Sequence, residues 1–401
     1  MAFSACPICN FSVPTHELER HANLHFIGED EARDMEFAWR IALLPPIPSP
    51  TNKYISIFVD SAPSSSHGID ARVDTTASEG NRNDRGHASL VLSQKREVLY
   101  KIEFDLMAML RRCLELERGS SRTVLCGYID HFQSIVSHDH GWGCGWRNIQ
   151  MLSSHLIKQR QEAQQVLYGG SGFVPNIESL QRWLELAWNK GFDPPGSDDF
   201  NQRVHGMKTW IGTTECAALL RSFGLRARIV DFSTRKAAGV SGPMDRFLSK
   251  GVDSSIAVSI GEKSYRDFGK GKGHQVLARW VWNYFSSSNT GESGNQPVVL
   301  SEKSPLYFQH DGHSRTIVGI QAKPEKKNGM LQYNLLILDP SERTRALEKS
   351  LSRNSGWQQL IKRGVRTLRK PQYQLCYVDP GIASGEELEE LKNMHSALHE
   401  L

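Results

Sequence analysis

The 401 residues carry a formal net charge of +4 at pH 7, with 48 basic and 44 acidic side chains. This near balance excludes a broad basic surface, so direct binding to nucleic acid is not expected, and no apolar stretch of about 18 residues predicts a membrane span or a membrane partner. The seven cysteines are odd in number and mostly far apart, which excludes a disulfide framework and favours a reducing compartment, the cytoplasm or the nucleus.

Residues 1–28 have the spacing of a C2H2-type zinc finger. Two cysteines with two residues between them are followed, after eleven intervening residues, by two histidines one helical turn apart, and four such ligands suit tetrahedral Zn²⁺ in a structural role. The predicted ligands are Cys6, Cys9, His21 and His25. The expected helix between residues 15 and 25 contains Glu17, Glu19 and one arginine, Arg20, which favours ubiquitin over nucleic acid as its partner.

Residues 29–44 and 45–93 are expected to be a helix and a linker. Met35, Ala38, Trp39 and Ala42 are spaced as one apolar face of a helix, which is either a ubiquitin-interacting helix or a plain extension of the finger. Prolines end this helix, and the following segment is rich in Ser, Gly, Asp and Asn, which predicts a disordered linker. If finger and helix both bind ubiquitin, two weak sites on a flexible linker favour polyubiquitin chains.

The segment from residue 94 to residue 390 is expected to form one large domain. Apolar periodicity predicts helices at residues 149–163, 177–189 and 214–223, besides helical spacing between residues 102 and 114. Strands are predicted at residues 227–232, 297–301, 316–321, 332–338 and 373–378. Because helices precede most strands, the pattern indicates an α+β fold.

Cys144 is the predicted nucleophile. It lies in the run GWGCGWRN over residues 141–148, and the apolar stripe that follows places it at the amino end of a helix, where a thiolate is stabilised. The flanking glycines allow backbone to approach the cysteine closely. The alternative is a buried structural cysteine that begins a core helix.

His313 is the preferred base for Cys144 among the fifteen histidines. Gly312 precedes it, and an apolar strand follows. A catalytic cysteine also needs a group that orients the imidazole, and Asp339, at the end of the next predicted strand, is the candidate.

The strand register decides whether Asp339 faces His313. If Gln321 pairs with Leu331, the two residues are directly opposite, with Cβ atoms about 4.5–5.5 Å apart. If residues 328–329 instead form a two-residue turn, Asp339 lies roughly 17 Å away. A His–Asp pair on neighbouring strands is also common on protein surfaces, so the assignment depends on Cys144.

A second donor for an oxyanion hole is expected besides the backbone N–H of Cys144. Gln133 and Gln309 are the candidates, and the sequence does not choose between them.

These motifs resemble the peptidase family that contains the UFM1-specific proteases, family C78. The resemblance rests on GWGCGWRNIQ, on WIGTTE at residues 210–215, on GHSRTIVGI from residue 312 and on LILDP, in this order over about residues 94–380. It implies a papain-like cysteine peptidase fold with Cys144, His313 and Asp339 as the triad. The proteases dedicated to UFM1 carry an Asp-Pro-His tripeptide, which is absent here, and a tyrosine where this chain has Phe132. The order Cys, His, Asp is that of the ubiquitin-cleaving branch.

The C-terminal tail of ubiquitin contains arginines, so an enzyme that cleaves it is expected to have carboxylates near the nucleophile to pair with them. Asp193 and Glu215 match positions in the family's motifs, and Trp142 is a further candidate substrate contact. The alternative is that Asp193 opens a turn before Pro194 and that Glu215 stabilises the start of a helix.

Together these features predict a deubiquitinating cysteine peptidase that cleaves after the C-terminal glycine of ubiquitin. The alternatives are a UFM1-specific peptidase on the same fold and an inactive adaptor that binds ubiquitin. Zn²⁺ is expected in the finger, and no cofactor is expected for catalysis.

Overall fold

The structure is a computed structural model that describes residues 3–5, 12–14, 80–233, 274–287, 296–310, 312–324 and 331–401. The chain divides into two units, Met1–Thr76 and Ala77–Leu401. In the first unit, β1 (Phe3–Ala5) pairs antiparallel with β2 (Ser12–Pro14). The four predicted zinc ligands and the predicted helix at residues 29–44 lie outside the described residues.

The described part of the second unit begins with α3 (Gly80–Ser93). The prediction of a disordered linker up to residue 93 is therefore wrong for residues 80–93, and residues 45–79 lie outside the described residues. The polar composition of this segment concealed a short apolar end, where Leu90 is buried and Val91 packs against the core. Gln94, just after the helix, donates from Nε2 to the carbonyl of Tyr168 at 2.9 Å. Tertiary packing thus orders a segment that composition alone assigns to disorder.

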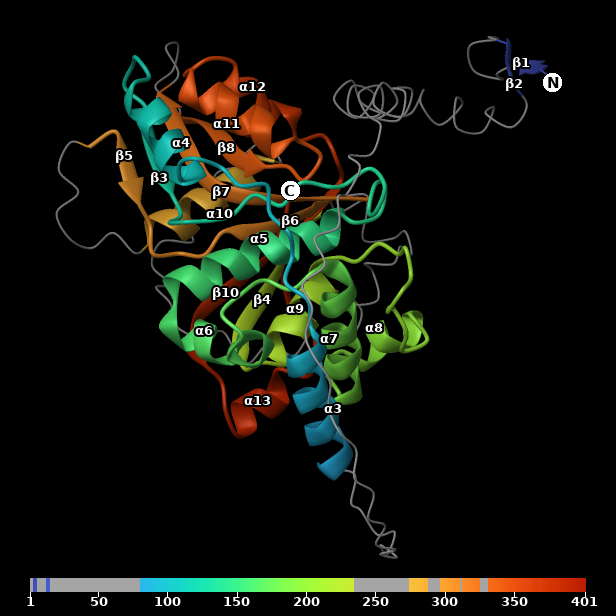
Figure 1. Cartoon of the computed structure of the whole chain (residues 1–401). Coiled ribbons are helices and arrows are strands. Elements are labelled where there is room, and N and C mark those ends of the chain that lie inside the picture. Colours follow the sequence, from blue (N-terminus) through green and yellow to red (C-terminus); the bar gives the residue numbers. More distant parts are fainter. Residues whose placement is uncertain are drawn as a thin grey trace, which may run out of the picture. The chain divides into compact units, whose positions relative to one another are not determined.

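A twisted and mainly antiparallel sheet forms the centre of the second unit (Figure 1). Its strands, in spatial order, are β11 (Ser396–Glu400), β4 (Leu225–Ser233), β10 (Gln372–Ile382), β6 (Leu306–His310), β7 (His313–Pro324), β3 (Arg122–Leu125) and β5 (Val298–Leu300). On its other side β7 pairs with β8 (Leu331–Leu338), which in turn pairs with β9 (Lys362–Gly364). The long strand β7 therefore contacts β6 near the start and β3 towards the end.

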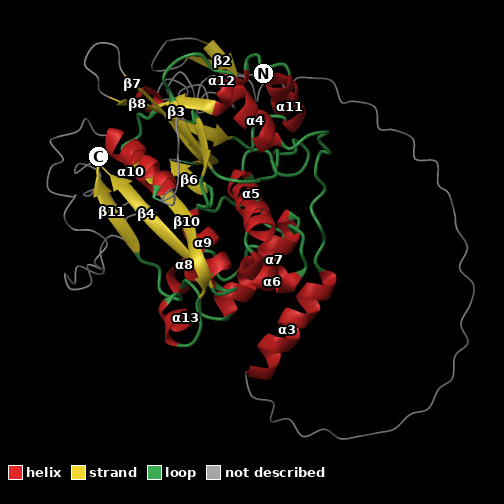
Figure 2. Cartoon of the chain, turned by 90° about the vertical axis from the view of Figure 1, so that its left-hand side faces the viewer, coloured by secondary structure: helices red, strands yellow, loops and turns green. Residues whose placement is uncertain are grey.

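Helices cover both faces of the sheet (Figure 2). One side carries α5 (Cys144–Gln159), α6 (Gln161–Val166), α7 (Ile177–Asn189) and α9 (Thr213–Arg221), and the other carries α10 (Gln275–Ser286). The remaining helices are α4 (Leu106–Glu115), α8 (Pro194–Asp199), α11 (Thr344–Ser352), α12 (Trp357–Ile361) and α13 (Glu386–Glu390), with 3-10 turns at Leu167–Gly170 and Val365–Thr367.

Helix α5 is buried along nearly its whole length. Trp146, Ile149, Leu152 and Leu156 are each fully buried. Each such side chain contributes about 1.5–3 kcal/mol by its removal from water. The helix that begins with Cys144 is thus held firmly in the core.

The predicted helices and strands agree with the structure in type, while their bounds differ. All five predicted strands lie within or overlap β4, β5, β7, β8 and β10, and the mixed organisation agrees with the α+β prediction. The helix predicted at residues 149–163 is two helices, because Arg160 adopts an extended conformation between α5 and α6.

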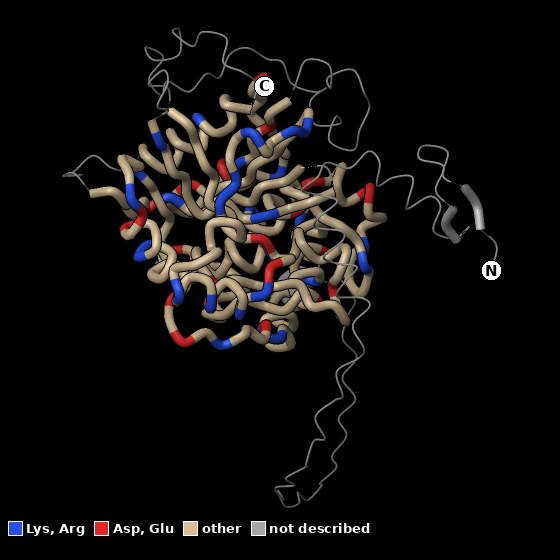
Figure 3. Tube along the Cα trace, turned by 90° about the horizontal axis from the view of Figure 1, so that it is seen from above, with Lys and Arg blue, Asp and Glu red and all other residues tan. Residues whose placement is uncertain are grey.

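Lys and Arg are interspersed with Asp and Glu over the described part of the chain (Figure 3). Within the described residues, no helix has the length and apolar content needed to cross a membrane.

Candidate active site

Cys144 is the first residue of α5, as the sequence predicts. Gly143 occupies the N-cap position and offers no side chain to the free backbone N–H groups, so the positive end of the helix dipole faces the half-buried thiol. Asn148 donates from Nδ2 to the carbonyl of Cys144 at 2.7 Å and accepts from Thr316 Oγ1 at 2.6 Å. Through Asn148, the first turn of α5 is tied to β7.

Gly145 allows a close approach within the protein. A Cβ atom at this position would lie 2.6 Å from the carbonyl oxygen of Ile211 and 2.9 Å from Tyr307 Oη. Trp146 Nε1 donates to the carbonyl of Thr209 at 3.4 Å. The glycine-flanked run therefore packs directly against residues 209–212, a contact that only a residue without a side chain permits.

Trp210 joins the cysteine side of the site to the histidine side. Its Nε1 donates to the carbonyl of Gly141, and its ring lies 3.7 Å from the position of a Cβ atom at Gly312. Gly141 is three residues before Cys144, and Gly312 directly precedes His313. The side chain of Trp210 is 57% exposed, so it covers this junction at the surface.

His313 is half-buried and begins β7, where it pairs with His310 of β6. The two imidazole ring centroids are 5.7 Å apart. The sequence correctly placed His313 at the entrance of a strand.

The register between β7 and β8 differs from both predicted registers. Gln321 pairs with Asn334 rather than with Leu331, and the register shifts between residues 317 and 319. A bulge at this point adds one residue to β7 and bends it, which local sequence does not reveal. Beyond the bulge Thr316 pairs with Leu338, so one further step places Asp339 opposite Arg315 rather than opposite His313.

The carboxylate of Asp339 is held by Arg315 and Ser341. Arg315 Nε donates to Oδ2, and Ser341 donates to Oδ1 from its backbone N–H at 2.9 Å and from Oγ at 2.7 Å. Burial alone would raise the pKa of Asp339, but the guanidinium of Arg315 and the bonds from Ser341 hold it well below its usual range. Asp339 is thus ionised and fixed.

His310 is a poor base despite its position. Arg315 donates from Nη1 to His310 Nε2 at 2.7 Å, so the imidazole carries its proton on Nδ1. Burial and then the charge of Arg315 lower the pKa of His310 to about 3. Its Nδ1 is buried and, among the described residues, has no hydrogen-bond partner. The sequence did not identify Arg315, although it lies in the same motif as His313.

His131 fixes the loop that carries Asp339. Its Nε2 lies 2.9 Å from the carbonyl oxygen of Asp339, and its Nδ1 lies 2.9 Å from Thr344 Oγ1. Burial lowers the pKa of His131 to about 4, so the ring is neutral.

The two oxyanion candidates lie in different places. Gln133 accepts through Oε1 from the backbone N–H of Thr344 at 2.8 Å, at the start of α11. The carboxamide of Gln309 lies 3.3–3.5 Å from a Cβ position at Gly212, and its buried Oε1 has no hydrogen-bond partner among the described residues.

Glu215 lies at the start of a helix, as the alternative from the sequence has it, and Asp193 begins a short helix, α8, rather than a turn. Asp193 is fully buried as the N-cap of α8 and accepts from Gly196 N at 3.2 Å. Glu215 is buried and accepts from Gly212 N at 2.6 Å. Burial raises the pKa of Asp193 to about 6 and that of Glu215 to about 7. Trp142 is half-buried and packs against the core.

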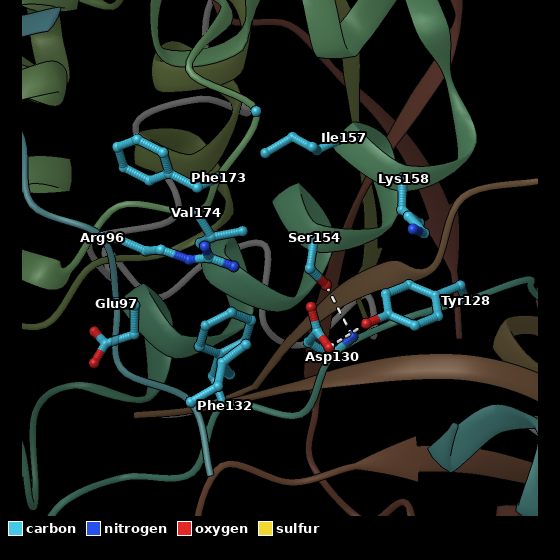
Figure 4. A pocket seen from close by; sticks show the side chains of 12 residues that line it. Arg96, Glu97, Tyr128, Asp130, Phe132, Ser154, Ile157, Lys158, Phe173 and Val174 are labelled. Atoms are coloured by element: carbon cyan, nitrogen blue, oxygen red, sulfur yellow. Dashed lines mark hydrogen bonds between the residues drawn. The ribbon is translucent and has the colours of Figure 1, made fainter. Parts of the chain in front are cut away.

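A cavity of about 200 Å³ lies elsewhere, beside the second half of α5 (Figure 4). Tyr128 Oη donates to Asp130 Oδ1 at 2.5 Å within it, and Ser154 Oγ accepts from the backbone of Asp130 at 3.0 Å. At a rise of about 1.5 Å per residue, Ser154 lies roughly 15 Å along the helix from Cys144. This cavity is not the site of the cysteine chemistry.

Comparisons with known proteins agree with the motifs. Residues 119–376 match the profile of peptidase family C78. A rat protein named "Zinc finger-containing ubiquitin peptidase 1" is 38% identical over 261 residues, which cover 65% of this chain and 37% of the rat protein. A Schizosaccharomyces pombe protein named "Ubiquitin carboxyl-terminal hydrolase mug105" is 29% identical over 256 residues, covering 64% of this chain and 82% of that protein.

The matched part of this chain thus spans little more than a third of the length of the rat relative. Among solved structures, UfSP from C. elegans matches with 16% sequence identity and a TM-score of 0.37, over 66% of this chain and 35% of that chain.

Proposed function

This chain belongs to peptidase family C78, and we propose that it is a deubiquitinating cysteine peptidase, which hydrolyses the bond after the C-terminal glycine of ubiquitin. The observation that carries the proposal is the junction at Trp210. It joins the loop before Cys144 to the turn before His313. The names of the rat and S. pombe relatives supply the link to ubiquitin.

The proposed reaction proceeds through a thioester. His313 takes the proton of the Cys144 thiol, and the thiolate adds to the carbonyl carbon of the terminal glycine. The tetrahedral intermediate collapses, and the leaving amine receives its proton from His313. Water then loses a proton to His313 and adds to the thioester, which releases the carboxylate of ubiquitin and restores the Cys144 thiol.

Asp339 is proposed to stabilise the imidazolium of His313. Because Arg315 and Ser341 keep its carboxylate ionised and fixed, Asp339 offers a constant negative charge on this side of the site. His310 is not proposed as the base, because the pKa of its buried imidazole is about 3.

The proposed specificity for a glycine tail follows from Trp210. The exposed indole lies across Gly141 and Gly312, so a chain that reaches Cys144 passes close to this ring. Glycine residues at the end of a substrate can pass the ring without a steric clash, because they have no side chain. A cysteine-first helix packed on an antiparallel sheet that carries the histidine also supports a papain-like fold.

Ubiquitin and UFM1 are distinguished by matched substrates. The full chain is given ubiquitin and UFM1, each with a fluorogenic C-terminal amide, beside its Cys144→Ala variant. We expect Cys144-dependent release from ubiquitin. Release from UFM1 alone would assign the chain to UFM1, and release from neither would favour the ubiquitin-binding adaptor.

The amino-terminal residues are proposed to hold Zn²⁺ and to capture polyubiquitin chains in the cytoplasm and nucleus. Removal of residues 1–44 should then slow the cleavage of long chains more than that of a single-ubiquitin substrate. Metal analysis should find zinc in the full chain and a loss of zinc in Cys6→Ser. Equal losses on both substrates would refute chain capture.

A further inference from the structure

A buried cluster of charges lies behind the nucleophile, on the first turn of α5. Arg147 is 3% exposed, although it follows Cys144 by less than one helical turn. A cation near a helix N-terminus is unfavourable with respect to the helix dipole, so this position requires compensating negative charge. Two carboxylates supply it, those of Asp139 and Glu97.

Asp139 forms a bidentate ion pair with Arg147 through both carboxylate oxygens. Arg147 Nε donates to Oδ2 at 2.9 Å and Nη2 donates to Oδ1 at 3.0 Å. The same residue organises the loop before the nucleophile, since its Oδ1 accepts from Ile135 N at 2.7 Å and its carbonyl accepts from Gly143 N at 2.8 Å. A Cβ atom at Gly143 would lie 2.4 Å from the Asp139 carboxylate, which requires glycine there. Arg147 and Asp139 therefore fix residues 135–143.

Glu97 holds Arg147 from the opposite side. Its Oε2 lies 3.0 Å from Arg147 Nη1 and accepts from Gln150 Nε2 at 2.8 Å. Gln150, which is fully buried, in turn accepts from Arg147 Nη1 at 3.0 Å. Glu97 also lines the cavity, but in Figure 4 its carboxylate points away from Asp130.

The backbone around Glu97 is itself anchored. Glu97 N donates to the carbonyl of Val174 at 2.9 Å, and Asn176 N donates to the carbonyl of Lys95 at 2.8 Å. Lys95 N donates to Ser179 Oγ at 2.9 Å. The segment therefore presents its carboxylate to α5 from a fixed position. It also lies outside residues 119–376, the region that matches the family profile.

We propose that Glu97 is a positioning residue for Cys144, acting through Arg147 and Asp139 on the loop that precedes the nucleophile. The inference rests on the proposed role of Cys144. Removing one partner from a buried charge cluster leaves the others uncompensated, and the strain falls on the first turn of α5. A displacement of about 1 Å at a reacting atom lowers turnover by roughly 100-fold.

The test compares Glu97→Gln and Glu97→Ala with Glu117→Gln in the full chain. Glu117 is a matched control, because its half-buried carboxylate likewise accepts from a cation, Lys362, and from a glutamine, Gln321. Three quantities are measured: kcat and KM on ubiquitin with a fluorogenic C-terminal amide, and the pH profile of Cys144 alkylation by iodoacetamide, located by mass spectrometry.

We expect Glu97→Ala to lower kcat about 100-fold and Glu97→Gln about tenfold, with a smaller change in KM. Both variants should shift the alkylation profile to lower pH, because loss of the Glu97 charge leaves the cation of Arg147 less compensated near Cys144, whereas Glu117→Gln should change neither kcat nor the profile. If Glu97→Ala does not fold, Glu97→Gln decides. A Glu97→Gln variant that matches Glu117→Gln in both readouts overturns the proposal. If the unaltered chain does not cleave ubiquitin, the proposed function fails, and the alkylation profile alone decides the role of Glu97.

Discussion

Cys144 and Asp339 lie on two halves of the candidate site, and the two halves are held by different interactions. The cysteine half is a helix start whose position follows from neighbouring residues, with Asp139 and Arg147 fixing the preceding loop. The half with Asp339 depends on the pairing of β7 with β8, which includes a bulge. Local sequence therefore specifies the start of α5 well, while the position of Asp339 depends on how two strands pair.

The two histidines of the second half should differ most in their effect on turnover. His313→Ala removes the proposed base, and we expect kcat/KM to fall by about 10⁴-fold or more. His310→Ala removes a neutral imidazole whose pKa is about 3, so the variant should retain most turnover. Both are measured with the fluorogenic ubiquitin substrate. A greater loss in His310→Ala would reverse the assignment of the base.

Arg315 should affect turnover through its effect on the ionisation of Asp339. Arg315→Gln removes the cation that holds the pKa of Asp339 below its usual range, so that pKa rises and the acid side of the kcat/KM profile moves to higher pH. We expect a loss of about 10- to 100-fold at neutral pH. An unchanged pH profile would show that Arg315 does not set the charge of Asp339.

Ionisation of the buried Glu215 should make the folded state less stable as the pH rises. Burial raises its pKa from 4.5 to about 7 in the folded state, so the folded protein binds this proton more tightly than the unfolded chain does. Stability is then lost between these two values, by on the order of 3 kcal/mol in total. Urea unfolding at pH 4.5 and pH 8 should show a smaller loss in Glu215→Gln than in the unaltered protein.

Glu117 provides the opposite case. Burial would raise its pKa, but hydrogen bonds from Lys362 and Gln321 lower it below the usual value. Its contribution to stability is therefore present above that value and is lost as the pH falls. Equal pH dependence in Glu215→Gln and Glu117→Gln would contradict both assignments.

Two glycines in the cysteine run should tolerate alanine to different degrees. Gly145→Ala places a Cβ atom 2.6 Å from the carbonyl of Ile211, and we expect a loss of about 1–3 kcal/mol in the free energy of unfolding together with reduced turnover. Gly141 has a φ of 82° and open space around a Cβ atom, so Gly141→Ala should cost about 1 kcal/mol. Equal losses of unfolding free energy in the two variants would mean that Gly145 does not pack closely against residues 209–212.

Sequence predicted the elements whose signals are local. The apolar stripe after Cys144 indicated α5, and the apolar residues within 316–321 indicated β7, and both were found. Helix α3 was missed because its packing residues are few and lie at its end.

The contacts at the site were harder to predict than its elements. The pairing of Asp339 with Arg315 follows from a bulge near residue 318 that no local pattern marks. A role for Glu215 at the start of a helix was foreseen as an alternative, and in the structure it accepts from the backbone N–H of the N-cap residue Gly212 of α9. The burial of Arg147 between two carboxylates could not be foreseen, because Glu97 is distant in sequence.

The role of Cys144 as the nucleophile of a ubiquitin-cleaving peptidase is tested most directly by covalent labelling of the full chain. The probes are ubiquitin with a cysteine-reactive group at its C-terminus and UFM1 with the same group. We expect one adduct with the ubiquitin probe, located on Cys144 by mass spectrometry, absent in Cys144→Ala and formed much more slowly in His313→Ala. Labelling of another cysteine, or labelling by the UFM1 probe alone, would contradict this role.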